Sequence, residues 1–245
     1  MQSIEEIRKV CQEPVIAENG WYIRNFVRRV SIYFTMFFLC TPVSANRITL
    51  LAIFMGIIAG GFLSIGGYAN GLIGVLFLQL FLIFDCADGE IARYKNQGSL
   101  RGKYLDLIAN DIVLVAIFLG LSIRMLNSNY RVPITFLSHN NVIFVFGLSA
   151  IVSHLLYKLS VYYAQEISGK SVVLTDLFLT GKKNMPLKSF LQALPHLVSI
   201  INITTIGAIF NLLPYVLIGY GIILPLWWIV STILRLYLSK EIIDD

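Results

Sequence analysis

Charge is what this 245-residue chain has least of: acidic and basic side chains make up 13% of it, against 57% hydrophobic residues. A soluble domain carries about 25% charged residues, so the composition excludes an ordinary soluble protein and favours an integral membrane protein. Cysteine is also scarce, and the three cysteines lack CxxC spacing, which argues against a disulfide framework or a zinc site. The net charge of +5 reflects basic loops on one membrane face and gives no reason to expect nucleic acid as a partner.

Long apolar runs take the place of charge, and each approaches the roughly twenty residues that a transmembrane helix needs. Hydropathy predicts six spans, at about 45–65, 68–93, 100–126, 141–164, 190–212 and 215–238. The predicted fold class is therefore an all-α integral membrane protein. We expect a cytoplasmic or interfacial segment over residues 1–44 and a six-transmembrane-helix bundle over residues 45–240.

Basic residues are unevenly distributed between the loops. The links after the first and fifth spans carry no charge, whereas the links after the second and fourth spans and the N-terminal segment are rich in lysine and arginine; Arg124 and Arg131, on the opposite side, are a minority. The positive-inside rule then places both termini and the link between spans two and three in the cytoplasm, at the inner membrane if the protein is bacterial. In residues 21–39, Arg24, Arg28 and Arg29 share one face. That pattern predicts an interfacial amphipathic helix with its basic face toward anionic head groups, the alternative being the start of another span.

Carboxylates gather where the second span ends. Asp85 and Asp88 directly follow the uncharged run 71–84, and ionisable groups within a span mark a functional site by default. The two lie within one helical turn of each other, and on the next helix Gly102, Asp106 and Asn110 follow at intervals of four, so they share one face. Two adjacent antiparallel helices would direct Asp85, Asp88 and Asp106 into one cavity.

Such a cluster predicts a cation. Three carboxylates share a cavity in their ionised form only if a cation neutralises them, and an all-oxygen site suits Mg²⁺ first and Mn²⁺ or Ca²⁺ next. Arg93 and Lys103 add positive charge suited to phosphate oxygens. The residues therefore predict a metal-bound diphosphate. The alternative is a set of solvated surface charges, which accounts for Glu90 but not for Asp85.

The same residues carry a resemblance to the CDP-alcohol phosphotransferases, also called CDP-alcohol phosphatidyltransferases. The signature of that family reads D-x2-D-G-x2-A-R-x8-G-x3-D-x3-D, and this chain supplies, at the same spacing, Asp85, Asp88, Gly89, Ala92, Arg93, Gly102 and Asp106. The resemblance implies that a CDP-linked lipid donor, usually CDP-diacylglycerol, yields its phosphoryl-alcohol group to a small alcohol acceptor and releases CMP in phospholipid biosynthesis. It also implies a homodimer embedded among membrane lipids.

Individual roles follow from the resemblance. Asp85, Asp88 and Asp106 would bind Mg²⁺ or Mn²⁺. The donor would contact Gly89, Ala92, Gly102 and, at its diphosphate, Arg93. Asn46 resembles the asparagine of the family's Pro-Asn-x-x-Thr pattern at the start of the first span, with Ala45 where the proline would stand. Asn46 would then contact the nucleotide, the alternative being a role in starting the helix.

The chain departs from the signature at Asn110, where the family has a fourth aspartate that ligates metal and deprotonates the acceptor hydroxyl. An amide cannot accept that proton. Asp111 does not simply replace the aspartate, because one residue turns a helix by about 100°. The catalytic candidates are thus Asn110, Asp106 and Asp111, with three readings open: a base from elsewhere, donor binding without efficient turnover, or an engineered residue.

The acceptor site has weaker candidates. His154 and Lys158 lie four residues apart on the fourth span, so they share a face. Lys158 would hold an acceptor phosphate or carboxylate, and His154 would accept a proton. The alternatives are a lysine extending to the interface and a structural histidine. For the whole protein, two other functions compete with the transferase: a CDP-lipid-binding pseudoenzyme, and an ion-coupled transporter with its carboxylates near the bilayer midplane.

Overall fold

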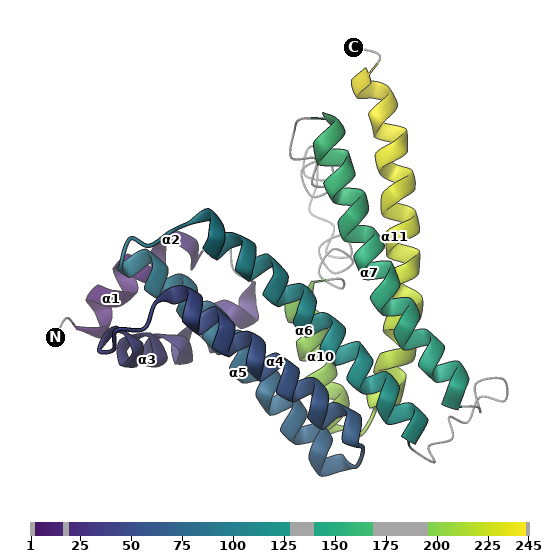
Figure 1. The fold of residues 1–245 in the computed structure, drawn as a ribbon, viewed down its shortest axis with the longest axis horizontal. Coiled ribbons are helices and arrows are strands. Elements are labelled where there is room, and N and C mark those ends of the chain that lie inside the picture. Colours follow the sequence, from purple (N-terminus) through teal and green to yellow (C-terminus); the bar gives the residue numbers. More distant parts are fainter. Residues whose placement is uncertain (1–2, 17–19, 128–139, 169–195, 244–245) are drawn as a thin grey trace. The chain divides into compact units, whose positions relative to one another are not determined.

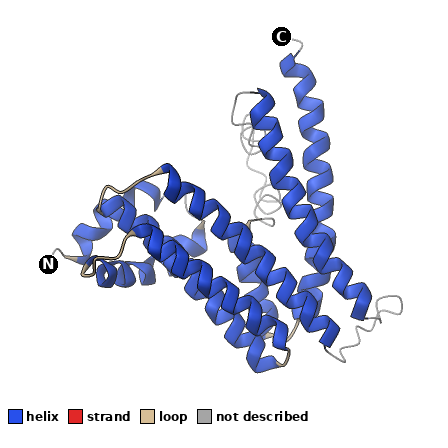
Figure 2. Ribbon diagram, in the orientation of Figure 1, coloured by secondary structure: helices blue, strands red, loops and turns tan. Residues whose placement is uncertain are grey.

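In the computed structural model, residues 3–16, 20–127, 140–168 and 196–243 are described, and every regular element in them is a helix (Figure 2). The α-helices are α1 (Ile4–Cys11), α2 (Glu13–Ile16), α3 (Arg28–Leu39), α4 (Ala45–Ile65), α5 (Tyr68–Tyr94), α6 (Leu100–Asn127), α7 (Asn140–Ser168), α10 (Leu197–Ile209) and α11 (Leu213–Ile243), and η1 (Ile23–Val27) is a π-helix. The all-α prediction is confirmed. The chain forms two compact units, Met1–Leu63 with Leu72–Ile117 and Ser64–Gly71 with Phe118–Asp245.

Five of the described helices are long and apolar enough to cross a membrane, as expected for an integral membrane protein. Helices α4, α5, α6, α7 and α11 contain these segments, close to five of the six predicted spans. The remaining predicted span, 190–212, corresponds in part to α10, which has only 13 residues. Residues 190–195 lie outside the described part, so the count of six spans is not confirmed.

Close packing of small residues holds the first unit together. Gly56 and Gly60 lie four apart on α4, and both face α6: a Cβ added at Gly60 would lie 2.6 Å from the carbonyl oxygen of Ala116. Such small-xxx-small faces let transmembrane helices approach closely enough for backbone contact. On α5, Phe77 stacks on Phe62 of α4 at 5.6 Å between ring centroids. The result is a tight arrangement of α4 with α5 and α6.

A short link reverses the chain between α5 and α6. Asn96 adopts the left-handed conformation with φ of 50°, and the Gln97 amide donates to the Ala92 carbonyl at 2.8 Å, which closes the end of α5. Helix α6 then begins after Ser99, whose hydroxyl accepts from the Gly102 amide at 3.1 Å. These two caps bring the start of α6 back beside the end of α5.

The N-terminal helices pack on the end of α5 through a buried face that is both apolar and polar. Ile7, Cys11 and Ile32 are buried there together with Arg28, whereas other large apolar side chains of this segment are exposed, as lipid contact would favour: Trp21, Phe26, Val30, Tyr33 and Phe37. The prediction that three arginines face lipid head groups is therefore wrong for Arg28. Its guanidinium pairs with Glu90 instead, because a buried carboxylate needs a compensating charge.

The second unit is organised around α7 and α11, which run side by side (Figure 1). Their backbones approach closely where Gly221 faces Phe146: an added Cβ would lie 2.5 Å from the Phe146 Cβ. From the second half of α6, Phe118 packs edge-on against Tyr220 at 5.6 Å between ring centroids. These contacts again depend on small residues between apolar helices.

Gly60→Ala tests the packing of the first unit. The added methyl group has no room against the Ala116 backbone, so we expect the thermal unfolding midpoint in detergent to fall by about 3–10 °C, the effect of moderate overpacking. Gly61→Ala is the matched control because no atom lies within 4 Å of its added Cβ. Equal midpoints for the two variants would contradict the packing described here.

Candidate functional site

A cavity of about 270 Å³ lies in the first unit where α4 begins, α5 ends and α6 begins. Its wall is formed by Ala45, Asn46, Thr49, Asp88, Gly89, Ala92, Gln97, Gly98, Ser99, Gly102, Lys103 and Asp106. Helical spacing explains the set, since residues one turn apart on each helix share the face that borders the cavity. Six of the predicted site residues are thereby brought together: Asn46, Asp88, Gly89, Ala92, Gly102 and Asp106.

Small residues keep this cavity open. A Cβ added at Gly102 would lie 3.2 Å from the side-chain oxygen of Asn46 and 3.3 Å from the hydroxyl oxygen of Ser99. A larger residue at this position would thus narrow the space between α4 and α6. Gly102 thus leaves space at the position where donor contact is predicted, and that contact stays a prediction.

Three carboxylates lie near one another at this point. Asp88 is buried and accepts a hydrogen bond of 2.5 Å from the Thr49 hydroxyl. Asp88 and Asp106 both interact electrostatically with Asp85, and Asp106 lies within hydrogen-bonding range of it. The three carboxylates therefore lie near one another on two helices, but only Asp88 and Asp106 line the cavity, so a single cavity shared by all three stays a prediction.

This cluster is not arranged as a finished metal site. Among the described residues, no group of three histidine, cysteine, aspartate or glutamate side chains is placed to hold one metal ion. The Oδ1 atom of Asp85 is nevertheless buried without a hydrogen-bond partner, and Asp88 is tied to Thr49. A buried carboxylate oxygen without a partner is costly, and a cation would satisfy it.

Asn110 turns its amide toward the cluster. Its Nδ2 donates to Oδ1 of Asp106 at 3.4 Å, one helical turn away on α6. An aspartate at this position would instead place a second carboxylate beside Asp106. Neither Asn110 nor its neighbour Asp111 lines the cavity, and both are partly buried.

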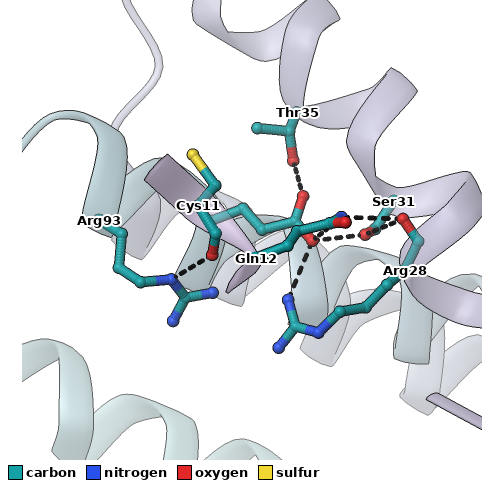
Figure 3. A network of polar contacts seen from close by, with 7 residues as sticks. Cys11, Gln12, Arg28, Ser31, Thr35 and Arg93 are labelled. Carbon is teal, nitrogen blue, oxygen red and sulfur yellow. Dashed lines mark hydrogen bonds and ion pairs between the residues drawn. The ribbon is translucent and has the colours of Figure 1, made fainter. Parts of the chain in front are cut away.

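Arg93 is held by the N-terminal segment. Its Nε donates to the carbonyl oxygen of Cys11 at 2.6 Å, and its two terminal nitrogens lie 3.4 Å from where a Cβ of Gly89 would stand (Figure 3). Arg93 itself does not line the cavity, but Gly89 does. The guanidinium therefore lies next to Gly89 of the cavity wall, where its charge acts on Asp88.

Glu90 is completely buried, so its interpretation as a solvated surface charge is wrong. It accepts hydrogen bonds at one oxygen from Gln12, Arg28 and Ser31 at 2.9, 3.1 and 2.7 Å. At its other oxygen it accepts one from Thr35 at 2.6 Å. Four donors, one of them the positively charged Arg28, compensate this charge, which is why it can lie inside the protein.

Residues 42–227 match the sequence profile of the CDP-alcohol phosphatidyltransferase family. The match covers well over half of the chain and includes every wall residue of the cavity. The chain belongs to the CDP-alcohol phosphatidyltransferase family. No curated protein sequence matches the chain. Enzymes of this family transfer a phosphoalcohol group from a CDP-alcohol to an acceptor alcohol, so phosphotransferase chemistry in phospholipid biosynthesis is the activity of the group to which this chain belongs.

The acceptor candidates of this family member lie in the second unit. His154 is buried and Lys158 is partly exposed, and both are on α7. That His154 and Lys158 contact an acceptor alcohol stays a prediction.

Sequence reasoning missed two parts of the site. It assigned no role to the link residues Gln97 and Ser99, although a short polar link between two motif helices is a usual place for ligand contacts. It also missed the network around Glu90. The sequence does offer a signal, since Glu90 is an acid close to an apolar run and an arginine-rich segment precedes it. Which arginine pairs with Glu90, however, depends on tertiary contacts.

Thr49→Val tests the anchoring of Asp88. The substitution keeps the shape of the side chain but removes the hydroxyl that donates to Asp88. Because groups that orient a ligand carboxylate typically contribute about ten- to a hundredfold, we expect CMP release from a CDP-alcohol to fall by at least tenfold. Thr49→Ser restores the donor and should retain most of the activity. Equal rates for the valine and serine variants would contradict a role for this hydrogen bond.

Proposed function

We propose that the protein transfers a phosphatidyl or related phosphoryl-alcohol group from CDP-diacylglycerol to a small alcohol and releases CMP, in a reaction that depends on a divalent cation. The observation that carries this proposal is the cavity at the ends of three helices, whose wall contains two acids of the family signature together with its small residues. Its open space beside Gly89, Ala92 and Gly102 suits a nucleotide, and its acids suit a cation bound to diphosphate.

The residues present fit a divalent cation. The unpartnered oxygen of Asp85 and the mutually repelling carboxylates of Asp88 and Asp106 would supply the oxygen ligands that Mg²⁺ prefers and Mn²⁺ accepts, once a cation draws them together. We propose Asp85, Asp88 and Asp106 as the ligands. When bound, the cation would neutralise these acids and the charge of the diphosphate.

The protein's own groups supply the rest of the reaction. The acceptor oxygen forms a bond to the β-phosphorus of the donor while the bond from that phosphorus to the oxygen of CMP breaks, and the hydroxyl proton passes to a carboxylate. Asp106 is the acid of α6 that lines the cavity, and Asn110 donates to it from behind. We therefore propose Asp106 as the first proton acceptor, with Asp111 as the alternative on the same helix.

Several further properties are proposed with this function. Basic residues at the α5–α6 link, such as Lys95 and Lys103, support a cytoplasmic location for the cavity and both termini. The exposed apolar face of η1 and α3 supports contact with membrane lipids. Lys158 and His154 are proposed for the acceptor, and a homodimer is proposed from family resemblance.

A transfer assay tests this function. Purified protein with Mg²⁺, radiolabelled CDP-diacylglycerol and a panel of alcohols should yield a labelled lipid and CMP, and chelation of the cation should abolish both. Asp88→Asn and Asp106→Asn should each lower the rate by at least about a hundredfold, because the charge that holds the cation is lost. Glu13→Gln removes an exposed acid and serves as the control with unchanged rate. No CMP release with any acceptor would contradict the proposed activity.

A second candidate function is that of a pseudoenzyme that binds the CDP-lipid without turnover. The observation that favours it is the contact of Asn110 with Asp106, which puts an amide where the family has a carboxylate. Asn110→Asp separates the two candidates in the same assay. For an active enzyme with another proton acceptor, we expect the rate of CMP release to change by less than about tenfold. A near-silent wild type and a gain of about a hundredfold or more in the variant would establish the pseudoenzyme instead.

A further inference from the structure

The N-terminal segment reaches the candidate site through its own polar contacts. Gln12 donates from its side-chain amide to both the carbonyl oxygen of Arg28 and the carboxylate of Glu90, at 2.8 and 2.9 Å. A single side chain thereby joins the end of α1, the start of α3 and the signature helix α5. All of these groups are buried, so each contact is made in the absence of competing water.

Cys11 lies directly before Gln12 and supplies the backbone oxygen that holds Arg93. The Cys11 side chain is completely buried in a small apolar cluster with Ile7 and Ile32, against Tyr94 of α5. The position of the Cys11 carbonyl is thus fixed twice, by this apolar cluster and by the hydrogen bonds of Gln12. Figure 3 shows Arg93 directed toward Cys11 on one side of the network and Arg28 on the other.

We propose that Gln12, Arg28 and Glu90 are positioning residues: they dock the N-terminal segment on α5 so that the Cys11 carbonyl holds Arg93 beside the nucleotide cavity. This inference rests on the proposed function, because Arg93 matters there only if a diphosphate binds. It adds to the family signature a part of the chain that lies before residue 42, where the family match begins. The N-terminal segment then acts on donor affinity without touching the donor.

A purely structural role would give a different result. If the docked segment only stabilised the fold, its loss would weaken the protein regardless of Arg93. If it positions Arg93, the loss should matter for nucleotide binding only while Arg93 is present, and a double-mutant cycle measures this dependence.

Thiol labelling measures docking directly. The three cysteines respond differently to a maleimide followed by peptide mass spectrometry: Cys40 is exposed and labels first, whereas Cys11 and Cys86 are buried. Burial and the nearby Glu90 carboxylate raise the pKa of the Cys11 thiol to about 11, which slows its labelling further while the segment is docked. Labelling of Cys86 reports on opening of the whole first unit. Faster labelling of Cys11 with Cys86 still protected therefore reports on release of the N-terminal segment alone.

Two variants loosen the segment to different degrees. Glu90→Ala removes the acceptor of all four donors. Gln12→Leu keeps the Arg28–Glu90 ion pair and removes only the amide contacts beside Cys11, so it remains informative if the first variant does not fold. We expect Gln12→Leu to speed Cys11 labelling by about tenfold or more with Cys86 still protected, as local opening requires. Glu5→Ala, at an exposed position of α1, is the control that leaves labelling unchanged.

The same full-length variants are then titrated with CDP and Mg²⁺ by calorimetry. We expect Gln12→Leu to weaken CDP binding about fivefold or more in the wild-type background but less than about twofold in the Arg93→Ala background. Equal weakening in both backgrounds, unchanged Cys11 labelling, or a wild type that does not bind CDP would each overturn the inference. If the effect of Gln12→Leu on CDP binding depends on Arg93 but the transfer assay yields no lipid product, the inference stands and only the proposed catalysis is contradicted.

Discussion

The compensation of buried negative charge at the end of α5 is the constraint on which the rest of the first unit depends. Four acids lie close together there, and each needs a partner because water is excluded. Glu90 receives its partners from the N-terminal segment, and Asp88 receives the Thr49 hydroxyl from α4. One buried oxygen of Asp85 has no hydrogen-bond partner, and a bound cation would compensate the cost of burying it. The end of α5 thereby contacts the N-terminal segment through Glu90 and borders, together with α4 and α6, the cavity.

The fold supports this arrangement through close backbone contact. Gly60 lets α4 approach α6, and the left-handed Asn96 reverses the chain so that both halves of the signature face the same space. The short link between them contributes Gln97 and Ser99 to the cavity wall. The chain belongs to the CDP-alcohol phosphatidyltransferase family, and a cavity lined by both acids and small residues fits the proposal that it binds a diphosphate-linked nucleotide.

Much of this could be predicted from the sequence where the information is local. The bounds of α4, α5 and α6 follow from uninterrupted apolar runs, and helical spacing brings Asp88, Gly89 and Ala92 to one wall. The surroundings of Glu90 could not be predicted, because Gln12 and Arg28 lie 78 and 62 residues away along the chain. For the same reason the arginines of the N-terminal segment were all assigned to head groups, although Arg28 is buried. Asn110 was recognised as a departure, but its contact with Asp106 required coordinates.

We propose that Asp85, Asp88 and Asp106 form a cation site that a CDP nucleotide completes. Electron paramagnetic resonance of Mn²⁺ can detect this site without turnover, because free and protein-bound Mn²⁺ give distinct signals. We expect the wild type to bind Mn²⁺ in the presence of CDP and Asp85→Asn to abolish this binding, while Glu13→Gln does not. Mn²⁺ binding that persists unchanged after Asp85→Asn, or that is absent from the wild type, would contradict it.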